Sequence, residues 1–367
     1  MLGSYLEEVQ TFLKSKLEKF NVVVMPDFFL DRFVSLNWSV EAFSEKVAVV
    51  AGRKGGSIDG IAQTEFRGGN AINTASALTS LDVKVTPIVC TDKLGFQLIK
   101  FYVKSSKVDL SHIKICEKMS ITTAMEFQTE NGKVNVMLRD VGSLADFSPQ
   151  NLNDEDFKAF ENADYVCVFN WAGTRNFGTE LAETVFSHVK TRGIGKTYYD
   201  TADPTPNKEK VQNLMRKVLR GNLVDVLSLN ENEAVFYASQ LSGKTEHLKE
   251  SLSFEESAKE SAKLLAKHLQ TRIDLHTTSF SATFTKSGEI AAVPAFKVPV
   301  LRATGAGDAW NAGNIVGDAY RLSDGARLAL ANAVAAYYVS NHEGKHPTRR
   351  ELLKFCNKLR EKANQNR

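Results

Sequence analysis

A glycine-rich turn late in the chain could hold an anion. Residues 302–313 read RATGAGDAWNAG, with Gly305, Gly307 and Asp308 at the start of an apolar helical pattern. In such a turn the backbone N–H groups of Ala306, Gly307 and Asp308 can approach an anion closely, and the helix dipole favours negative charge there. An aspartate in a first helical turn is equally a plain N-terminal charge or cap. The turn alone therefore predicts either an anion site or an ordinary helix start.

Two further segments pair polar side chains at helical spacing. The segment NENE places Asn230 and Glu233 after a strand-like run, and their oxygens suit Mg²⁺, although the same pair is also a capping box that touches no metal. The segment GGNAINTA follows Gly69 with Asn70 and Asn73, one helical turn apart, so both side chains could face a cleft together. Alternatively, Asn70 caps the helix and Asn73 bonds locally.

Other polar residues follow strand-like runs. Asp27 and Asp31 lie in MPDFFLDRF beside two phenylalanines, a combination that suits a polyol, although Asp27 is also a typical turn residue. Arg139 could meet an acidic or phosphorylated substrate or simply be solvated. Asn170 and Trp171 follow the run DYVCVF, and Trp171 could instead belong to the core.

Composition excludes several classes of protein. The 367 residues carry 46 basic and 43 acidic side chains, so the net charge of +3 favours neither nucleic acid nor an anionic membrane as a partner. The four cysteines form no CxxC pair, which indicates a reducing cytoplasm, and no apolar run is long enough to span a membrane. The first 20 residues have amphipathic helical spacing and should dock on the domain or on a second subunit.

Strand and helix patterns alternate along most of the chain, which is typical of a parallel sheet covered on both faces. The expected strands are 21–26, 83–90, 164–169, 196–200, 224–229 and 272–278. The expected helices before residue 302 are 71–81, 94–105, 178–192, 207–219, 231–240 and 254–270, and the chain is helical after it.

Two segments interrupt this alternation. Residues 32–66 and 119–139 carry strand-like pieces such as KVAVVAG and a hairpin signal at Asn131-Gly132, without a helix. We expect them to form a small antiparallel sheet that acts as a lid. The expected division is a helical extension at 1–20, a main domain at 21–31, 67–118 and 140–367, and the lid at 32–66 and 119–139.

Three motifs in order resemble the ribokinase-like, pfkB-type carbohydrate kinases: FRGGNAINTASALTSLDVKVTPIVCTDKLG, LSLNENEA and ATGAGDAWNAG. The chain has neither the GxxxxGK[ST] of P-loop enzymes nor a GxGxxG after its first strand. The resemblance covers about residues 21–350. It implies a three-layer, doubly wound α/β fold with a mostly parallel sheet and a β lid, and a homodimer formed through that lid.

The resemblance also implies roles for the residues above. Asp308 would be the base that takes the proton from the acceptor hydroxyl, and the N–H groups of residues 305–308, with Gly305, Ala306 and Gly307, would stabilise the transferring phosphoryl group. The other implied contacts are Asn230 and Glu233 with Mg²⁺, Thr278, Thr304 and Gly307 with the nucleotide, and Asp31, Gly69, Asn70 and Asn73 with the acceptor. Weaker acceptor candidates are Asp27, Arg139 and Asn170.

The chain departs from the family pattern in two places. Arg302 and Ala303 replace an Asp-Thr pair, and the lost acid helps to hold K⁺ in relatives that this cation activates, so we expect a rate independent of K⁺. Thr278 and Ser281 replace two glycines beside the nucleotide, which leaves ADP or another nucleotide possible in place of ATP.

The sequence thus predicts a Mg²⁺-dependent kinase that phosphorylates a hydroxyl of a sugar or sugar-like small molecule. The alternatives are a nucleoside or vitamin-precursor kinase of the same fold and a non-catalytic ligand-binding relative.

Overall fold

An eight-stranded, mostly parallel sheet forms the centre of the protein in a computed structural model that describes residues 2–16, 18–130, 132–241 and 253–365. The strand order is β14-β13-β12-β11-β10-β9-β1-β4, and only β13 and β14 run antiparallel to their neighbours. The bounds are β1 Asn21–Met25, β4 Lys84–Pro87, β9 Tyr165–Phe169, β10 Lys196–Asp200, β11 Val226–Leu229, β12 Arg272–His276, β13 Phe280–Thr285 and β14 Gly288–Pro294.

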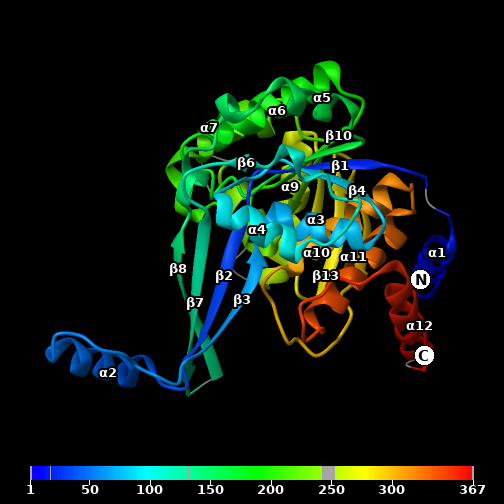
Figure 1. Cartoon of the computed structure of the whole chain (residues 1–367). Coiled ribbons are helices and arrows are strands. Elements are labelled where there is room, and N and C mark those ends of the chain that lie inside the picture. The colour runs from blue at the N-terminus through cyan, green and yellow to red at the C-terminus, as the bar shows by residue number, and fades with distance from the viewer. Residues whose placement is uncertain (1, 17, 131, 242–252, 366–367) are drawn as a thin grey trace.

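Helices cover both faces of this sheet and bury two separate cores (Figure 1). Alternate residues of β1 show why: Val22 and Val24 contribute to one core and Val23 and Met25 to the other. One face carries α1 Leu2–Lys14, α3 Asn70–Ser80, α4 Lys93–Tyr102, α10 Ala306–Ala319, α11 Asp324–Val339 and α12 Arg349–Gln365. The other carries α5 Asp154–Asn162, α6 Gly178–Arg192, α7 Val211–Leu214, α8 Glu231–Ser239 and α9 Phe254–Leu269. The predicted three-layer, doubly wound fold is confirmed.

Most predicted elements of the main sheet are present with small shifts of their ends. The predicted strand 83–90 is shorter, because β4 ends at Pro87 and a separate pair follows, β5 Cys90–Thr91 with β6 Lys114–Ile115. The predicted helix 207–219 consists of a 3-10 turn, α7 and a π-helical turn. Further 3-10 turns are Leu110–His112, Gly142–Asp146 and Pro149–Asn151. Within the described residues, no helix is both long and apolar enough to cross a membrane.

The N-terminal helix docks on its own domain. Leu6 and Val9 of α1 are fully buried, and α1 packs against α11 and α12. Glu8 accepts hydrogen bonds from the backbone N–H and the hydroxyl of Ser323, the residue that caps α11. Of the two predicted positions of this helix, on the domain or on a second subunit, the structure shows the first.

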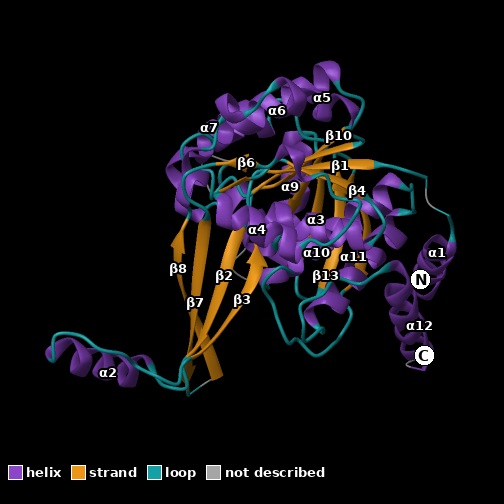
Figure 2. Cartoon of the chain, viewed as in Figure 1, coloured by secondary structure: helices purple, strands orange, loops and turns teal. Residues whose placement is uncertain are grey.

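The lid sheet extends away from the helix-covered sheet, as Figure 2 shows. Its strands are β2 Phe29–Ser35, β3 Ala62–Gly68, β7 Ser120–Thr129 and β8 Gly132–Asp140, in the order β3-β2-β7-β8. The central pair, β2 and β7, is parallel, so the prediction of an antiparallel sheet is wrong for that pair. Asn131 of the predicted hairpin turn lies outside the described residues, whereas the β7–β8 pairing on either side of it is present.

The prediction that the lid segments contain no helix is wrong. Residues read as the strand-like KVAVVAG belong to α2, Val40–Gly52, at the far end of the lid (Figure 1). Ser39 caps this helix, since its hydroxyl accepts a hydrogen bond from the backbone N–H of Ala42 at 3.2 Å. None of the α2 residues is buried. β-Branched residues favour a strand when their side chains pack against neighbouring strands, and the α2 segment has no such packing.

Candidate active site

The lid meets the main domain at a cavity of about 210 Å³. The cavity lies where the lid strands β2, β7 and β8 meet the residue after β9 and the first turns of α3 and α10. Parallel α/β sheets bind ligands at such strand ends. Most of the residues predicted from the sequence line it: Asp31, Gly69, Asn70, Asn73, Arg139, Asn170, Thr304, Gly305 and Asp308. The fold thus brings together residues that lie up to 277 positions apart in the chain.

Asp308 lies in the first turn of α10 with only 5% of its surface exposed. The side-chain amides of Asn70 and Asn73 donate to its two carboxylate oxygens at 2.8 and 2.9 Å. Burial raises the pKa of Asp308 to about 8, and the nearby carboxylates of Asp200 and Asp27 add to this, whereas the two amides oppose it. Asp308 is therefore an oriented carboxylate with the raised pKa of a general base.

The turn before Asp308 is the segment predicted to bind an anion. Gly305 has a φ of +87°, and a Cβ there would lie 2.7 Å from the hydroxyl oxygen of Tyr338, so only glycine fits. The N–H of Ala306 donates to the carbonyl of Ala303 at 3.2 Å and is not free as predicted. Among the described residues, the N–H groups of Gly307 and Asp308 donate to no backbone carbonyl, so two donors remain for an anion.

The two predicted carboxylates after β1 occupy different environments. Asp31 lines the cavity, and burial raises its pKa to about 6 despite a hydrogen bond from Thr122 and the charge of Arg139. Asp27 is fully buried, does not line the cavity and accepts hydrogen bonds from the N–H groups of Asn70 and Ala71 at 2.9 and 2.8 Å. The geometry corrects the expectation that Asp27 could contact a substrate, because it caps α3 instead.

Asn170 and Arg139 complete the cavity in different ways. Asn170 is buried, donates to Asp27 at 2.7 Å and accepts from the N–H of Gly173 at 2.9 Å, so its amide is already satisfied. The guanidinium of Arg139 lies over the ring of Phe29, 5.4 Å from its centroid, at the mouth of the cavity. Trp171 is 2% exposed and bonds to Thr179, so the alternative that placed it in the core is the right one.

Asn230 and Glu233 form the reciprocal capping box at the start of α8. The Glu233 carboxylate accepts from the N–H and the amide of Asn230 at 2.9 and 2.8 Å, and the Asn230 oxygen accepts from the N–H of Glu233 at 3.0 Å. Burial and the charge of Asp200 raise the pKa of Glu233 well above its ordinary value.

This arrangement suits a water-bound divalent cation. In the described part of the chain, no three carboxylate, imidazole or thiolate groups are placed to hold a metal together. Mg²⁺ commonly keeps several waters and uses one or two carboxylates with substrate phosphates. The negative charges of Glu233 and Asp200 repel each other, and a divalent cation would reduce this repulsion. These residues therefore fit a Mg²⁺ ion that is held through its bound waters.

The predicted nucleotide residues after β12 separate into an exposed and a buried position. Thr278 is exposed in the turn between β12 and β13. Ser281 is buried and donates to the amide oxygen of Asn332 at 2.6 Å, so its side chain fills space that glycine would leave. His276, which the sequence analysis missed, packs against Trp310 with the two rings tilted by 33°, and a Cβ at Gly307 would lie 3.4 Å from the His276 ring.

Two other contributors were not found from the sequence. Asp200 ends β10, accepts from the amide of Asn311 at 2.6 Å and raises the pKa values of Asp308 and Glu233. The position of Asp200 at the end of a predicted strand is the sequence feature that could have identified it. Tyr338 of α11 donates to the carbonyl of Thr304 at 3.1 Å, and nothing in its helical surroundings marks it.

The chain is similar to known kinases in sequence and in fold. The model of the pfkB family carbohydrate kinases matches residues 38–350. The ribokinase of Arabidopsis thaliana, solved with ribose and ATP, is 19% identical with a TM-score of 0.67 over 93% of this chain and 99% of its own. Adenosine kinase from Sinorhizobium meliloti is 17% identical with a TM-score of 0.66, over 88% and 95% of the two chains. Among curated proteins, none matches the chain in sequence.

Proposed function

Because the chain belongs to the pfkB family of carbohydrate kinases, we propose that it transfers the terminal phosphoryl group of ATP to a hydroxyl of a sugar or sugar-like small molecule. One observation carries this proposal: Asp308 faces the cavity beside two free N–H groups, with each carboxylate oxygen held by an asparagine amide. A base and an anion site are thereby within reach of one bound alcohol. A non-catalytic relative would have no need of this combination.

The proposed step follows from these positions. The acceptor hydroxyl binds between Asp31 and Asn73, whose amide oxygen is buried without a hydrogen-bond partner in the described structure. Asp308 takes the hydroxyl proton as the oxygen forms its bond to the terminal phosphorus and the bond to the ADP oxygen breaks. The N–H groups of Gly307 and Asp308 stabilise the negative charge on the transferring group.

Glu233, oriented by Asn230, would hold the Mg²⁺ waters near the nucleotide phosphates, and the ion when bound would neutralise phosphate charge. Thr304 lines the cavity and Thr278 follows β12, and we propose that both contact the nucleotide. Closure of the lid over the acceptor would exclude water from the reaction.

A nucleoside kinase is the second candidate, because Phe29 and Phe33 line the cavity and could stack on a base. One of the similar structures is an adenosine kinase, whereas another contains ribose. A panel of sugars, polyols and nucleosides, each with ATP or ADP, separates the candidates when nucleotide turnover is coupled to a colour change. Turnover with a free sugar supports the proposal, and turnover confined to nucleosides supports the second candidate.

We also propose that two chains pair through their lids. The edge strand β8 exposes Val134, Val136 and Leu138, with between 44% and 57% of their surfaces accessible, and an open sheet edge favours pairing. Sedimentation velocity of the wild type and of Val136→Lys tests this, since the charge should shift the sedimentation coefficient to that of a monomer.

The free thiols of Cys90, Cys116, Cys167 and Cys356 support a cytoplasmic location.

A further inference from the structure

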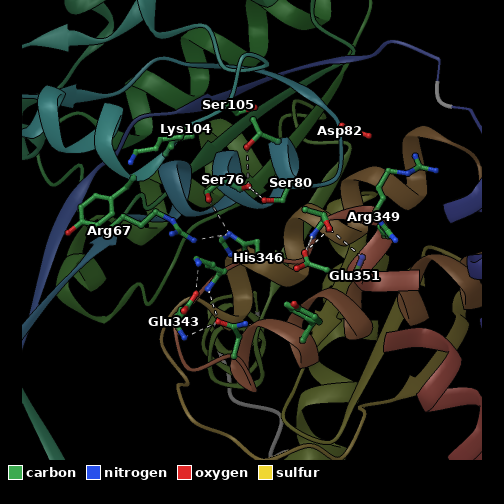
Figure 3. A pocket seen from close by; sticks show the side chains of 18 of the residues that line it. Arg67, Ser76, Ser80, Asp82, Lys104, Ser105, Glu343, His346, Arg349 and Glu351 are labelled. Carbon is green, nitrogen blue, oxygen red and sulfur yellow. Dashed lines mark hydrogen bonds and ion pairs between the residues drawn. The ribbon is translucent and has the colours of Figure 1, made fainter. Parts of the chain in front are cut away.

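A second and larger depression lies beside the later turns of α3, whereas the active-site cavity lies at the first turn of this helix. Its volume is about 1090 Å³, and it separates α3 and the end of α4 from residues 341–351 (Figure 3). We call it the α3–α12 groove. Its lining residues share none with the active-site cavity. Nothing in the proposed reaction uses it.

The groove has an excess of positive charge that its own acids do not neutralise. Its acids have other partners: Glu343 pairs with Lys345, which also lines the groove, Asp82 pairs with Lys107 at 2.7 Å, and Glu351 accepts from the N–H of Thr348 at 2.8 Å. Four further cations line the groove, and within the described chain none of them pairs with a carboxylate: Arg67, Lys104, Arg349 and Arg350. Because an arginine cannot lose its charge, this excess persists at any physiological pH.

Three buried polar atoms in the groove have no hydrogen-bond partner among the described residues, and all are donors. They are Nε of Arg67, Nε2 of His346 and Nη1 of Arg349. His346 is 6% exposed, and its Nδ1 lies 2.8 Å from Nη2 of Arg67, which can only donate. Nδ1 is therefore an acceptor, so a neutral His346 carries its proton on Nε2.

Burial and the charges of Arg67 and Arg302 lower the pKa of His346 well below its ordinary value, so the ring is neutral near pH 7. The tautomer therefore follows from the contact with Arg67. Figure 3 shows Arg67 and His346 joined across the groove, with Arg349 toward its other end. The unpartnered donors of Arg67, His346 and Arg349 would be satisfied by a negatively charged acceptor.

From these observations we infer that the α3–α12 groove binds a small molecule bearing a phosphate group. A phosphate supplies several acceptor oxygens and negative charge, and guanidinium groups bind it in a fixed geometry. The hydroxyls of Ser76, Ser80 and Ser105 can bond the remaining polar atoms, while Phe101 and Tyr102 offer apolar surface for an organic portion.

Such a ligand would contact both segments that form the active site. Arg67 directly precedes the Gly68–Gly69 turn that leads to Asn70. The ring of His346 stacks on Tyr338 with centroids 4.6 Å apart, and Tyr338 bonds to Thr304. The groove thereby borders the acceptor side and the anion-binding side of the cavity.

Titration calorimetry with inorganic phosphate at constant ionic strength tests the inference on the whole chain. The groove variant is Lys104→Gln with Arg350→Gln, two exposed residues whose loss should not affect folding. The control, Lys158→Gln with Arg192→Gln, removes the same charge from exposed positions of α5 and α6. We expect the wild type and the control to bind phosphate alike and the groove variant to bind about tenfold more weakly.

Two results would overturn the inference. One is the absence of phosphate binding by the wild type at millimolar concentrations. The other is equal binding by all three proteins, because phosphate bound at the start of α10 would not sense the groove residues. The measurement requires no turnover, so its outcome is independent of the proposed kinase activity.

Discussion

The guanidinium of Arg302 lies over the ring of Phe66, 3.8 Å from its centroid. Phe66 belongs to the lid strand β3, and Arg302 precedes the turn that leads to Asp308. The same guanidinium approaches the ring of Tyr338 at 5.9 Å and fills the space beside Gly344. A fixed positive charge thus links the lid, α11 and the segment after it, next to the anion-binding turn.

The first prediction concerns monovalent cations. Arg302 places a permanent charge at the position where the family resemblance implies an acid that helps to hold K⁺. We therefore expect kcat to change by less than about twofold when KCl replaces choline chloride at constant ionic strength. The assay is nucleotide turnover with the best acceptor of the panel. Activation by K⁺ of several-fold would show that Arg302 does not substitute for the cation.

The second prediction concerns pH. Only ionised Asp308 can accept the hydroxyl proton, and burial raises its pKa to about 8. Activity should therefore rise with pH, and kcat/KM should increase about tenfold per pH unit below that value and level off above it. A flat profile between pH 6 and 9 would be incompatible with Asp308 as the base.

The third prediction concerns the hydrogen bond that Asn70 donates to Asp308. The amide of Asn70 stabilises the ionised form of Asp308, so Asn70→Ala should raise the apparent pKa of kcat/KM by up to about one unit. The control is Asn213→Ala, a half-buried asparagine of α7 outside the cavity. An unchanged pKa in Asn70→Ala would mean that this hydrogen bond does not tune the base.

The fourth prediction distinguishes two neighbouring acids. In the wild type, the Asp27 carboxylate accepts hydrogen bonds from the N–H groups of Asn70 and Ala71 and from the side-chain amide of Asn170. In Asp27→Asn, the new NH₂ group would face these donors, so the free energy of unfolding in urea should fall by about 2–4 kcal/mol. Asp31→Asn should not lower the free energy of unfolding, because burial already disfavours the ionised form of Asp31, but it should raise KM for the acceptor. The reverse pattern would exchange the structural and binding roles assigned to the two residues.

The main sheet could be predicted from the sequence because its signals are local. Val22, Val23 and Val24 form a β-branched run buried on both faces, and the helix 178–192 was placed at its true ends. The helix α2 was missed because Val47, Val49 and Val50 also favour a strand, and only the absence of a neighbouring strand decides between the two.

The site could be predicted only as far as its motifs extend. Asp308, Asn70 and Asn73 stand in recognisable segments, but their mutual hydrogen bonds join residues 235 or more positions apart. The sequence left Asp27 open between a substrate contact and a turn residue, because a carboxylate after a strand looks the same whether it faces a ligand or caps a neighbouring helix. Tyr338 and His346 carried no signal, since their contacts with Thr304 and Arg67 arise only from tertiary packing.

The most direct test of the proposed chemistry is the turnover of Asp308→Asn with ATP and the best acceptor. The control is Asp154→Asn, an exposed acid in the first turn of α5, and nucleotide binding is measured by calorimetry for all three proteins. We predict that Asp308→Asn lowers kcat by about 10³-fold while its nucleotide affinity and the activity of the control stay near those of the wild type. Turnover of Asp308→Asn within about tenfold of the wild type would contradict the assignment of Asp308 as the base.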